Sequence, residues 1–185
     1  MNSFINKYSD IWGSNPKQLM EEYNYNLELT DKLDKLDISN FNRESFYEII
    51  LWKLNRFPII ENTLLDELKT LSSLKTGEHK ISKEILKKLL SCSGIRLPMA
   101  STILRFINPE VFQIIDDRVF RILFSESKMP TKTAKVTEKY LENSCEIYFK
   151  YIDKLVEICD DNLPFFDADR IIYLLDIKLG NKIGD

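Results

Sequence analysis

Two adjacent carboxylates, Asp116 and Asp117, follow a short apolar run and are followed in turn by Arg118 and Arg121. A carboxylate held at the start of a helix can stabilise positive charge that develops on a bound substrate. The same group can orient or deprotonate an attacking water. Aspartate at a loop-to-helix junction is also a preferred N-cap, which stabilises a helix by about 1 kcal/mol. Either aspartate could be the cap, and one carboxylate could serve both purposes.

Upstream of these carboxylates, the pattern predicts two helices joined by a tight turn over residues 93–96. Gly94 supplies the backbone freedom that such a turn needs, and Pro98 suits the first turn of the second helix. Backbone N–H groups at the start of a helix have no intrahelical partner and can bind a DNA phosphate. An ordinary helix C-cap explains Gly94 equally well when that residue is taken alone.

Residues 94–123, GIRLPMASTILRFINPEVFQIIDDRVFRIL, resemble the helix-hairpin-helix (HhH-GPD) DNA glycosylase superfamily, which includes endonuclease III and the adenine glycosylases. In that family the hairpin glycine precedes the string apolar-apolar-Asp-x-x-Val-x-Arg-apolar-leucine, which spans residues 114–123 here. The resemblance implies that Asp116 is the catalytic carboxylate, with Asp117 as the second candidate. A looser similarity in helix order extends from about residue 41 to 176. The family usually has a second hairpin glycine, and Arg96 occupies its position.

The resemblance implies an enzyme that flips a nucleotide out of double-stranded DNA and hydrolyses the base–sugar bond. Bifunctional relatives carry a lysine at the position of Pro98, and this lysine attacks the sugar as an amine nucleophile. Because proline cannot do so, we expect a monofunctional DNA N-glycosylase that leaves an abasic site. Its substrate would be a damaged or modified base, in repair or in defence against phage DNA. The alternative is a non-catalytic helix-hairpin-helix module for DNA binding or assembly.

The residues predicted to bind DNA surround the hairpin turn and the start of the helix after Asp116: Lys88, Gly94, Ile95, Arg96, Pro98 and Arg118. In relatives, the helix that corresponds to EIILWKLNR helps to line the base pocket. Trp52 could therefore stack on a flipped base, and Lys53 or Arg56 could contact phosphate. A core tryptophan flanked by solvated cations is the alternative interpretation.

The charge distribution favours a DNA interface at the hairpin although the net charge is −3. Residues 83–121 contain seven basic and four acidic residues, a local charge of +3, which leaves −6 for the remainder. A locally basic face suits a nucleic acid, and a solvated helix surface would have a similar composition. We therefore expect double-stranded DNA as the partner, and no obligate protein partner is evident.

Cysteine and histidine content predicts no iron–sulfur cluster and no metal site. Many relatives carry a four-cysteine iron–sulfur loop, whereas this chain has only Cys92, Cys145 and Cys159, widely spaced in helix-like apolar patterns. Buried reduced thiols are the simplest interpretation. The single histidine, His79, is expected in a loop, and the only ion we anticipate is a monovalent cation at the hairpin.

Apolar residues recur at helical spacing along most of the chain, and glycine and proline are few. Stripes over residues 46–54, 81–90, 141–159 and 171–175 each predict a helix. The strand-like run Val111–Ile115 is interpreted as an extended link, and residues 38–41 and 125–130 as loops. We predict an all-α, two-lobed helical fold of one domain over residues 1–185, with the hairpin at about 81–107, the catalytic loop at 108–121 and a cleft at Asp116.

No apolar run reaches the ~18 residues that a membrane-spanning helix requires. Residues 1–10 also lack the apolar centre of a signal peptide. We therefore expect a cytoplasmic protein that does not engage a membrane.

Overall fold

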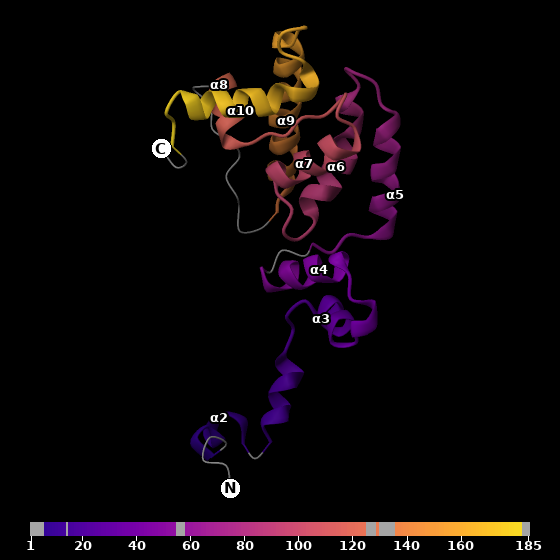
Figure 1. Ribbon diagram of the computed structural model, residues 1–185, viewed down its shortest axis with the longest axis vertical. Helices are drawn as coiled ribbons and strands as arrows, with labels where there is room; N and C mark the ends of the chain where they lie inside the picture. Colours follow the sequence, from indigo (N-terminus) through magenta and orange to yellow (C-terminus); the bar gives the residue numbers. More distant parts are fainter. Residues whose placement is uncertain (1–5, 14, 55–57, 125–128, 130–135, 183–185) are drawn as a thin grey trace. The chain divides into compact units, whose positions relative to one another are not determined.

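A computed structural model of the chain describes residues 6–13, 15–54, 58–124, 129 and 136–182 (Figure 1). Within these residues all regular elements are helices and no strand occurs, which confirms the predicted all-α fold. None of the helices described has the length and apolar character to cross a lipid bilayer. The chain divides into two units, Met1–Phe57 and Pro58–Asp185, which are described separately below.

The first unit contains short helices that are mostly exposed. Its elements are α2 (Ser9–Trp12), the 3-10 helix η1 (Pro16–Glu22), α3 (Leu27–Asp34), the 3-10 turn η2 (Ile38–Asn40) and α4 (Arg43–Lys53). The predicted loop at 38–41 therefore includes one 3-10 turn. The helix predicted around residues 46–54 is present as α4, begun by Asn42, whose side chain accepts a hydrogen bond from the Ser45 amide.

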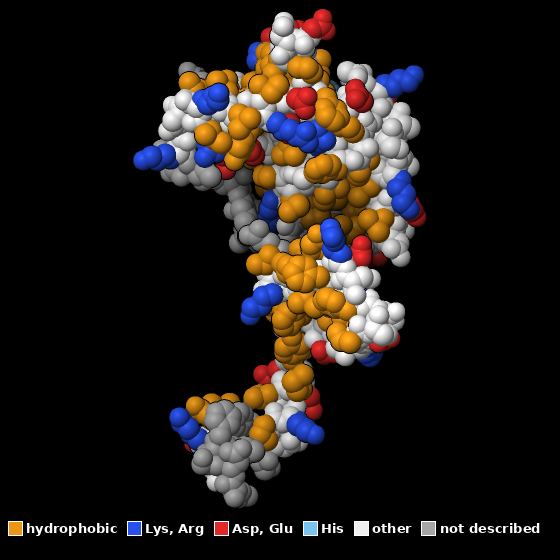
Figure 2. Space-filling view, in the orientation of Figure 1, with side chains coloured by type: hydrophobic (Ala, Val, Ile, Leu, Met, Phe, Trp, Pro, Cys, Tyr) orange, Lys and Arg blue, Asp and Glu red, His pale blue; other side chains and the backbone are white. Residues whose placement is uncertain are grey.

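The apolar stripe of α4 is not covered within its own unit. Phe46, Ile49, Ile50 and Leu54 are between 39% and 58% exposed. Figure 2 shows the resulting hydrophobic surface over α4. Helical periodicity thus located the helix correctly, but the stripe does not form a buried core.

The second unit contains the main hydrophobic core. Its elements are α5 (Asn62–Thr70), η3 (Leu71–Ser73), η4 (His79–Ser82), α6 (Lys83–Ser91), α7 (Leu97–Ile107), α8 (Asp117–Leu123), α9 (Glu138–Ile158), η5 (Phe165–Asp167) and α10 (Ala168–Lys178). The long helix α9 contacts α6, α8 and η4. Its predicted stripe is buried from Leu141 to Leu155, whereas Val156 is 42% exposed and Cys159 follows the end of the helix.

The two helices predicted for the hairpin are present. In α6, Leu86, Leu89 and Leu90 have no solvent exposure, so this face packs into the core. The helix ends at Ser91, and Gly94 adopts a φ of +83°, the left-handed region that favours glycine. The next helix, α7, carries Pro98 in its first turn, as expected from the fixed φ of proline.

The strand-like run Val111–Ile115 forms neither a helix nor a strand, which confirms its interpretation as a link. Val111, Phe112 and Ile115 are almost completely buried. The link therefore passes through the core between α7 and α8. Its position determines where Asp116 and α8 begin.

The predicted final helix is present as α10, but its buried face differs from the apolar stripe. Ile171, Leu174 and Leu175 are more than 40% exposed, whereas the buried positions are Ala168, Asp169, Ile172 and Asp176. Two carboxylates thus lie on the buried face of this helix.

Asp176 joins α10 to α8. Its carboxylate is fully buried and binds Arg118 Nη1 at 2.7 Å and Arg121 Nη2 at 2.6 Å. Arg121 Nε and the Asn181 side-chain amide donate two further hydrogen bonds, at 2.7 and 2.8 Å. These donors, Arg121 first, hold the pKa of Asp176 well below its usual range. The ion pair therefore fixes α10 against α8.

The prediction that His79 lies in a loop is wrong. His79 is 3% exposed and opens the 3-10 helix η4, where its ring contacts Phe149. Its Nε2 lies 3.0 Å from Asp153 Oδ1, but neither ring nitrogen forms a well-aligned hydrogen bond. Burial lowers the pKa of His79 despite the nearby carboxylate. The histidine therefore packs as a core side chain.

Replacing the buried carboxylate, Asp176→Asn, should lower the free energy of unfolding by about 3 kcal/mol, because two arginines lose their buried partner. Asp66→Asn, in an exposed pair with Lys69, is the matched control and should change stability little. Urea denaturation at several pH values measures both. Since the folded-state pKa of Asp176 is depressed, its stabilisation is present at neutral pH and is lost on acidification. A wild-type-like acid sensitivity in Asp176→Asn would contradict this assignment.

Candidate functional site

Asp116, rather than Asp117, is the N-cap of α8. Its Oδ1 accepts a hydrogen bond of 2.8 Å from the Val119 amide, while Asp117 is the first helical residue and is exposed. Among the residues described, the second carboxylate oxygen of Asp116 has no hydrogen-bond partner. One oxygen thus fixes the side chain, and the other is available for a bound molecule.

Three hydrogen bonds from two different helices fix the link that leads to Asp116. The hydroxyls of Tyr148 and Tyr151 on α9 donate to the carbonyls of Gln113 and Ile114, at 3.0 and 2.6 Å. The Ile115 amide donates to Ser101 Oγ on α7 at 3.2 Å. Burial raises the pKa of both tyrosines, which keeps them neutral and able to donate. Asp116 is therefore carried on a segment held from both sides.

Asp116 lines a cavity of about 340 Å³. The cavity is lined by Ile114, Asp116, Val119, Asp169, Arg170, Tyr173 and Leu174. Mostly apolar walls with a few polar groups are typical of sites for small molecules. The walls come from the link, from α8 and from α10.

Asp116 is the only lining residue that was predicted as a site residue, and the polar residues missed are Asp169, Arg170 and Tyr173. Asp169 is 4% exposed and accepts a hydrogen bond of 2.7 Å from the Arg170 amide. Burial raises the pKa of Asp169, a shift that this amide hydrogen bond opposes. The sequence did contain a signal for Asp169: it lies three residues before Ile172, and residues at this spacing share one face of a helix, here the buried face of α10.

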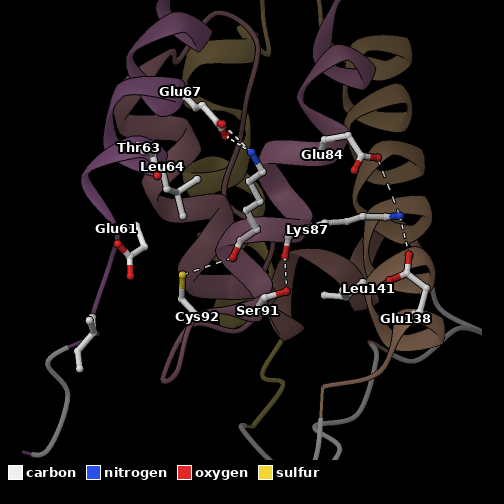
Figure 3. Close-up of a pocket in the computed structure, with 12 residues that line it drawn as sticks. Glu61, Thr63, Leu64, Glu67, Glu84, Lys87, Ser91, Cys92, Glu138 and Leu141 are labelled. Atoms are coloured by element: carbon white, nitrogen blue, oxygen red, sulfur yellow. Dashed lines mark hydrogen bonds and ion pairs between the residues drawn. The ribbon is translucent and has the colours of Figure 1, made fainter.

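A larger cavity of about 460 Å³ lies among α5, α6 and the start of α9 (Figure 3). The two lysines that line this cavity form ion pairs with glutamates. Lys87 pairs with Glu138 at 2.7 Å and with Glu142, and Lys88 pairs with Glu67 at 2.6 Å. Hydrogen bonds to Glu138 and Glu142 raise the pKa of Lys87 strongly. Because its lysines are already paired, we place the candidate chemistry at the cavity of Asp116 instead.

Two residues predicted to contact DNA have partners within the protein. Lys88 binds Glu67, and Arg118, with only 13% of its side chain exposed, binds Asp176. Lys83 and Lys87 likewise pair with Glu142, so carboxylates outside the window 83–121 offset its positive charge. The role of Arg118 is therefore internal: it holds α8 against α10.

The turn between α6 and α7 remains accessible. Gly94 and Pro98 are exposed, Ile95 is buried, and Arg96 is half-buried at the N-cap of α7. Arg96 Nη1 donates to the Ile95 carbonyl at 3.0 Å. Of the basic residues described in α6, the turn and α7, Arg96 alone is accessible and has no carboxylate in an ion pair.

The residues predicted for the base pocket lie in the first unit. Trp52 is half-buried, and its Nε1 donates to Thr30 Oγ1 at 2.8 Å while its ring meets Tyr25 edge-on. Lys53 is exposed, and Arg56 lies outside the described residues. These contacts fit the interpretation of Trp52 as a packed tryptophan, and a role in base stacking stays a prediction.

The described residues contain no group of histidine, cysteine and acidic side chains that could hold a metal ion. All three cysteines have free thiols, and burial raises the pKa of Cys145 to about 11. These thiols are therefore protonated at neutral pH.

No family model, curated protein or solved structure matches this chain. The functional proposal therefore depends on the geometry of the Asp116 cavity together with the resemblance of residues 94–123.

Removing one hydroxyl from the link, Tyr151→Phe, should lower the free energy of unfolding by about 1–2 kcal/mol, because the Ile114 carbonyl loses its buried donor. Hydrogen exchange at the amides of residues 113–115 should also accelerate. Tyr140→Phe on the same helix is the control, since no hydrogen bond of that hydroxyl joins it to the link. Equal exchange rates in the two variants would show that the Tyr151 hydroxyl does not hold the segment.

Proposed function

We propose that this chain is a monofunctional DNA N-glycosylase with Asp116 as its catalytic carboxylate. The observation that carries the proposal is the carboxylate of Asp116, which lines a cavity and is fixed at the start of α8 by a hydrogen bond to one of its two oxygens. The cavity, at about 340 Å³, lies at the small end of the range for ligand sites, which suits a single extruded nucleotide.

Breaking the bond between deoxyribose and base builds positive charge on the sugar. The unpartnered oxygen of Asp116 stabilises that charge most effectively if it does not move during the reaction. The hydrogen bonds of the link and of the N-cap satisfy this condition. The same oxygen can accept a hydrogen bond from the water that attacks the sugar.

The walls of the cavity suit a flat heterocycle. Tyr173 supplies an aromatic ring, and Ile114, Val119 and Leu174 supply apolar contacts. A flipped base gains about 1–3 kcal/mol from stacking on one aromatic side chain. This contact offsets part of the few kcal/mol needed to unstack the base from the duplex.

The hairpin is joined directly to the site through α7. Ser101, which binds the link, lies five residues after Arg96, a distance of about 7.5 Å along the helix axis. A phosphate bound by the turn amides and Arg96 would thus lie near the nucleotide whose base enters the cavity. This arrangement supports the use of the turn as a DNA contact.

The side chains present support hydrolysis rather than lyase chemistry. Pro98 carries no amine, and no lysine lines the cavity in the part of the chain that the structure describes. A Schiff base with the sugar requires such an amine. The product would be an abasic site in an intact strand.

A non-catalytic assembly module is the second candidate. It is favoured by the pairing of Lys83, Lys87 and Lys88 with glutamates, which reduces the positive field at the hairpin. Such a module would not need the carboxylate charge of Asp116, and this difference allows a direct test.

Asp116→Asn should abolish base release, because the anion is lost, while the fold is kept, because asparagine caps a helix as well as aspartate does. Asp117→Asn, one residue away and exposed, is the matched control and should retain activity. Bases released from modified DNA are measured by mass spectrometry. Abasic sites in intact strands are detected as strand breaks that form only after alkali treatment. Activity in Asp116→Asn and loss in Asp117→Asn would reverse the assignment. Activity in both, or none in the wild type, would contradict the glycosylase proposal.

DNA affinity should fall as salt rises, with a slope of about 0.9 per neutralised phosphate. Arg96→Glu should lower the magnitude of that slope by about 1, because the accessible cation of the hairpin is lost. Lys154→Glu, on the surface of α9 outside the hairpin, should leave it nearly unchanged. Fluorescence anisotropy across a salt series measures both. Binding that does not respond to salt would favour a protein partner.

A further inference from the structure

The cavity contains two carboxyl groups whose environments differ. Asp116 is half-buried and binds a helix amide, whereas Asp169 is 4% exposed and lines the cavity from α10. Two carboxyl groups in unlike surroundings can divide acid and base roles between them. Sequence alone assigned no chemistry to Asp169.

We propose that Asp169 is a general acid that protonates the departing base, and that the substrates are therefore neutral bases rather than positively charged alkylated ones. This inference rests on the proposed glycosylase function and adds to it both a second catalytic residue and a substrate class.

The chemistry balances as a hydrolysis. The bond between C1′ and the base nitrogen breaks, and its electron pair stays on the base. Asp169 transfers its proton to a ring nitrogen of that base, while Asp116 stabilises the cationic sugar. Water adds to C1′, and the proton that it releases restores the acid form of Asp169. A base that is already cationic leaves as a neutral molecule and does not need the first proton.

The surroundings of Asp169 suit a proton donor. Burial raises its pKa, and the buried phenols of Tyr148 and Tyr151 on α9 are uncharged neighbours. Two arginines oppose this rise in pKa: Arg105 on α7 and Arg170 on α10, whose positive charges favour the ionised carboxylate. Neither arginine makes an ion pair with Asp169, in contrast to the two that bind Asp176.

Asp169 also has a structural role, which the test must separate from catalysis. Its carboxyl accepts the Arg170 amide at 2.7 Å and lies beside the backbone amide of Ile114. Asparagine keeps an oxygen that can accept from both amides and loses the transferable proton. Asp169→Asn is therefore the informative variant. Asp167→Asn, two residues earlier and not part of the cavity, is its control.

The experiment measures base release by the wild-type chain from two sets of DNA. The neutral set is DNA deaminated with nitrous acid, DNA oxidised with peroxide and phage DNA with modified bases. The cationic set is DNA methylated with dimethyl sulfate, in which 7-methylguanine and 3-methyladenine carry the charge. We expect the wild type to release at least one neutral base. Release from the cationic set alone would overturn the inference and leave the glycosylase proposal standing, whereas release from neither would contradict both.

The variant then tests the role of the proton. Asp169→Asn should slow single-turnover release of the neutral base by about 100-fold or more, the range of general acid catalysis. Any release of a cationic base should change by less than about threefold. An equal loss on both sets, or no loss on the neutral base, would contradict proton donation.

A pH profile of the wild type supplies a measurement that does not depend on folding of the variant. Release of the neutral base should decline as pH rises through the pKa of Asp169, because the donor becomes ionised. Asp169→Glu, which restores a carboxyl group, should recover part of the activity and the same decline. If the rate of neutral-base release did not decline at high pH in either the wild type or Asp169→Glu, the inference would also be overturned.

Discussion

The passage of the link, residues 111–115, through the core is the constraint on which the site depends. A buried extended segment leaves its backbone carbonyls without helical or strand partners, and each unpaired group would cost about 1–3 kcal/mol. The hydroxyls of Tyr148 and Tyr151 supply donors to two of these carbonyls. As a result, the hydrogen bonds that satisfy the buried carbonyls of this segment also fix the start of α8 and the carboxylate of Asp116.

The helix α10 uses its two buried carboxylates in different ways. Asp176 is neutralised by two arginines of α8 and holds the helices together. Asp169, two turns earlier on the same face, accepts a hydrogen bond from the Arg170 amide and forms no ion pair with Arg105 or Arg170. A buried acid with two guanidinium partners stays ionised, whereas one without such partners is held closer to its neutral form. The ion pair at one end of α10 therefore positions the carboxyl group at the other end over the cavity.

Local composition overstated the positive character of the hairpin. The lysines of α6 form ion pairs with glutamates of α5 and α9, which come from distant parts of the chain. The groups that could still bind an anion are the first amides of α7 and the side chain of Arg96. DNA binding there would depend on the geometry of one turn more than on the field of a basic surface.

Helices, turns and caps could be predicted because the interactions that make them are local. The spacing of apolar residues located α6, α9 and α10, Gly94 located the turn, and the aspartate at the junction located the N-cap of α8. Burial could not be predicted equally well, since an apolar stripe does not reveal whether another element covers it. The stripe of α4 is exposed, whereas His79 is buried. The cavity also joins residues that are distant in sequence: Asp169 and Tyr173 meet Asp116 only because α10 folds back onto α8 around Asp176. Periodicity carries no information about such contacts, because they depend on how helices pack in three dimensions.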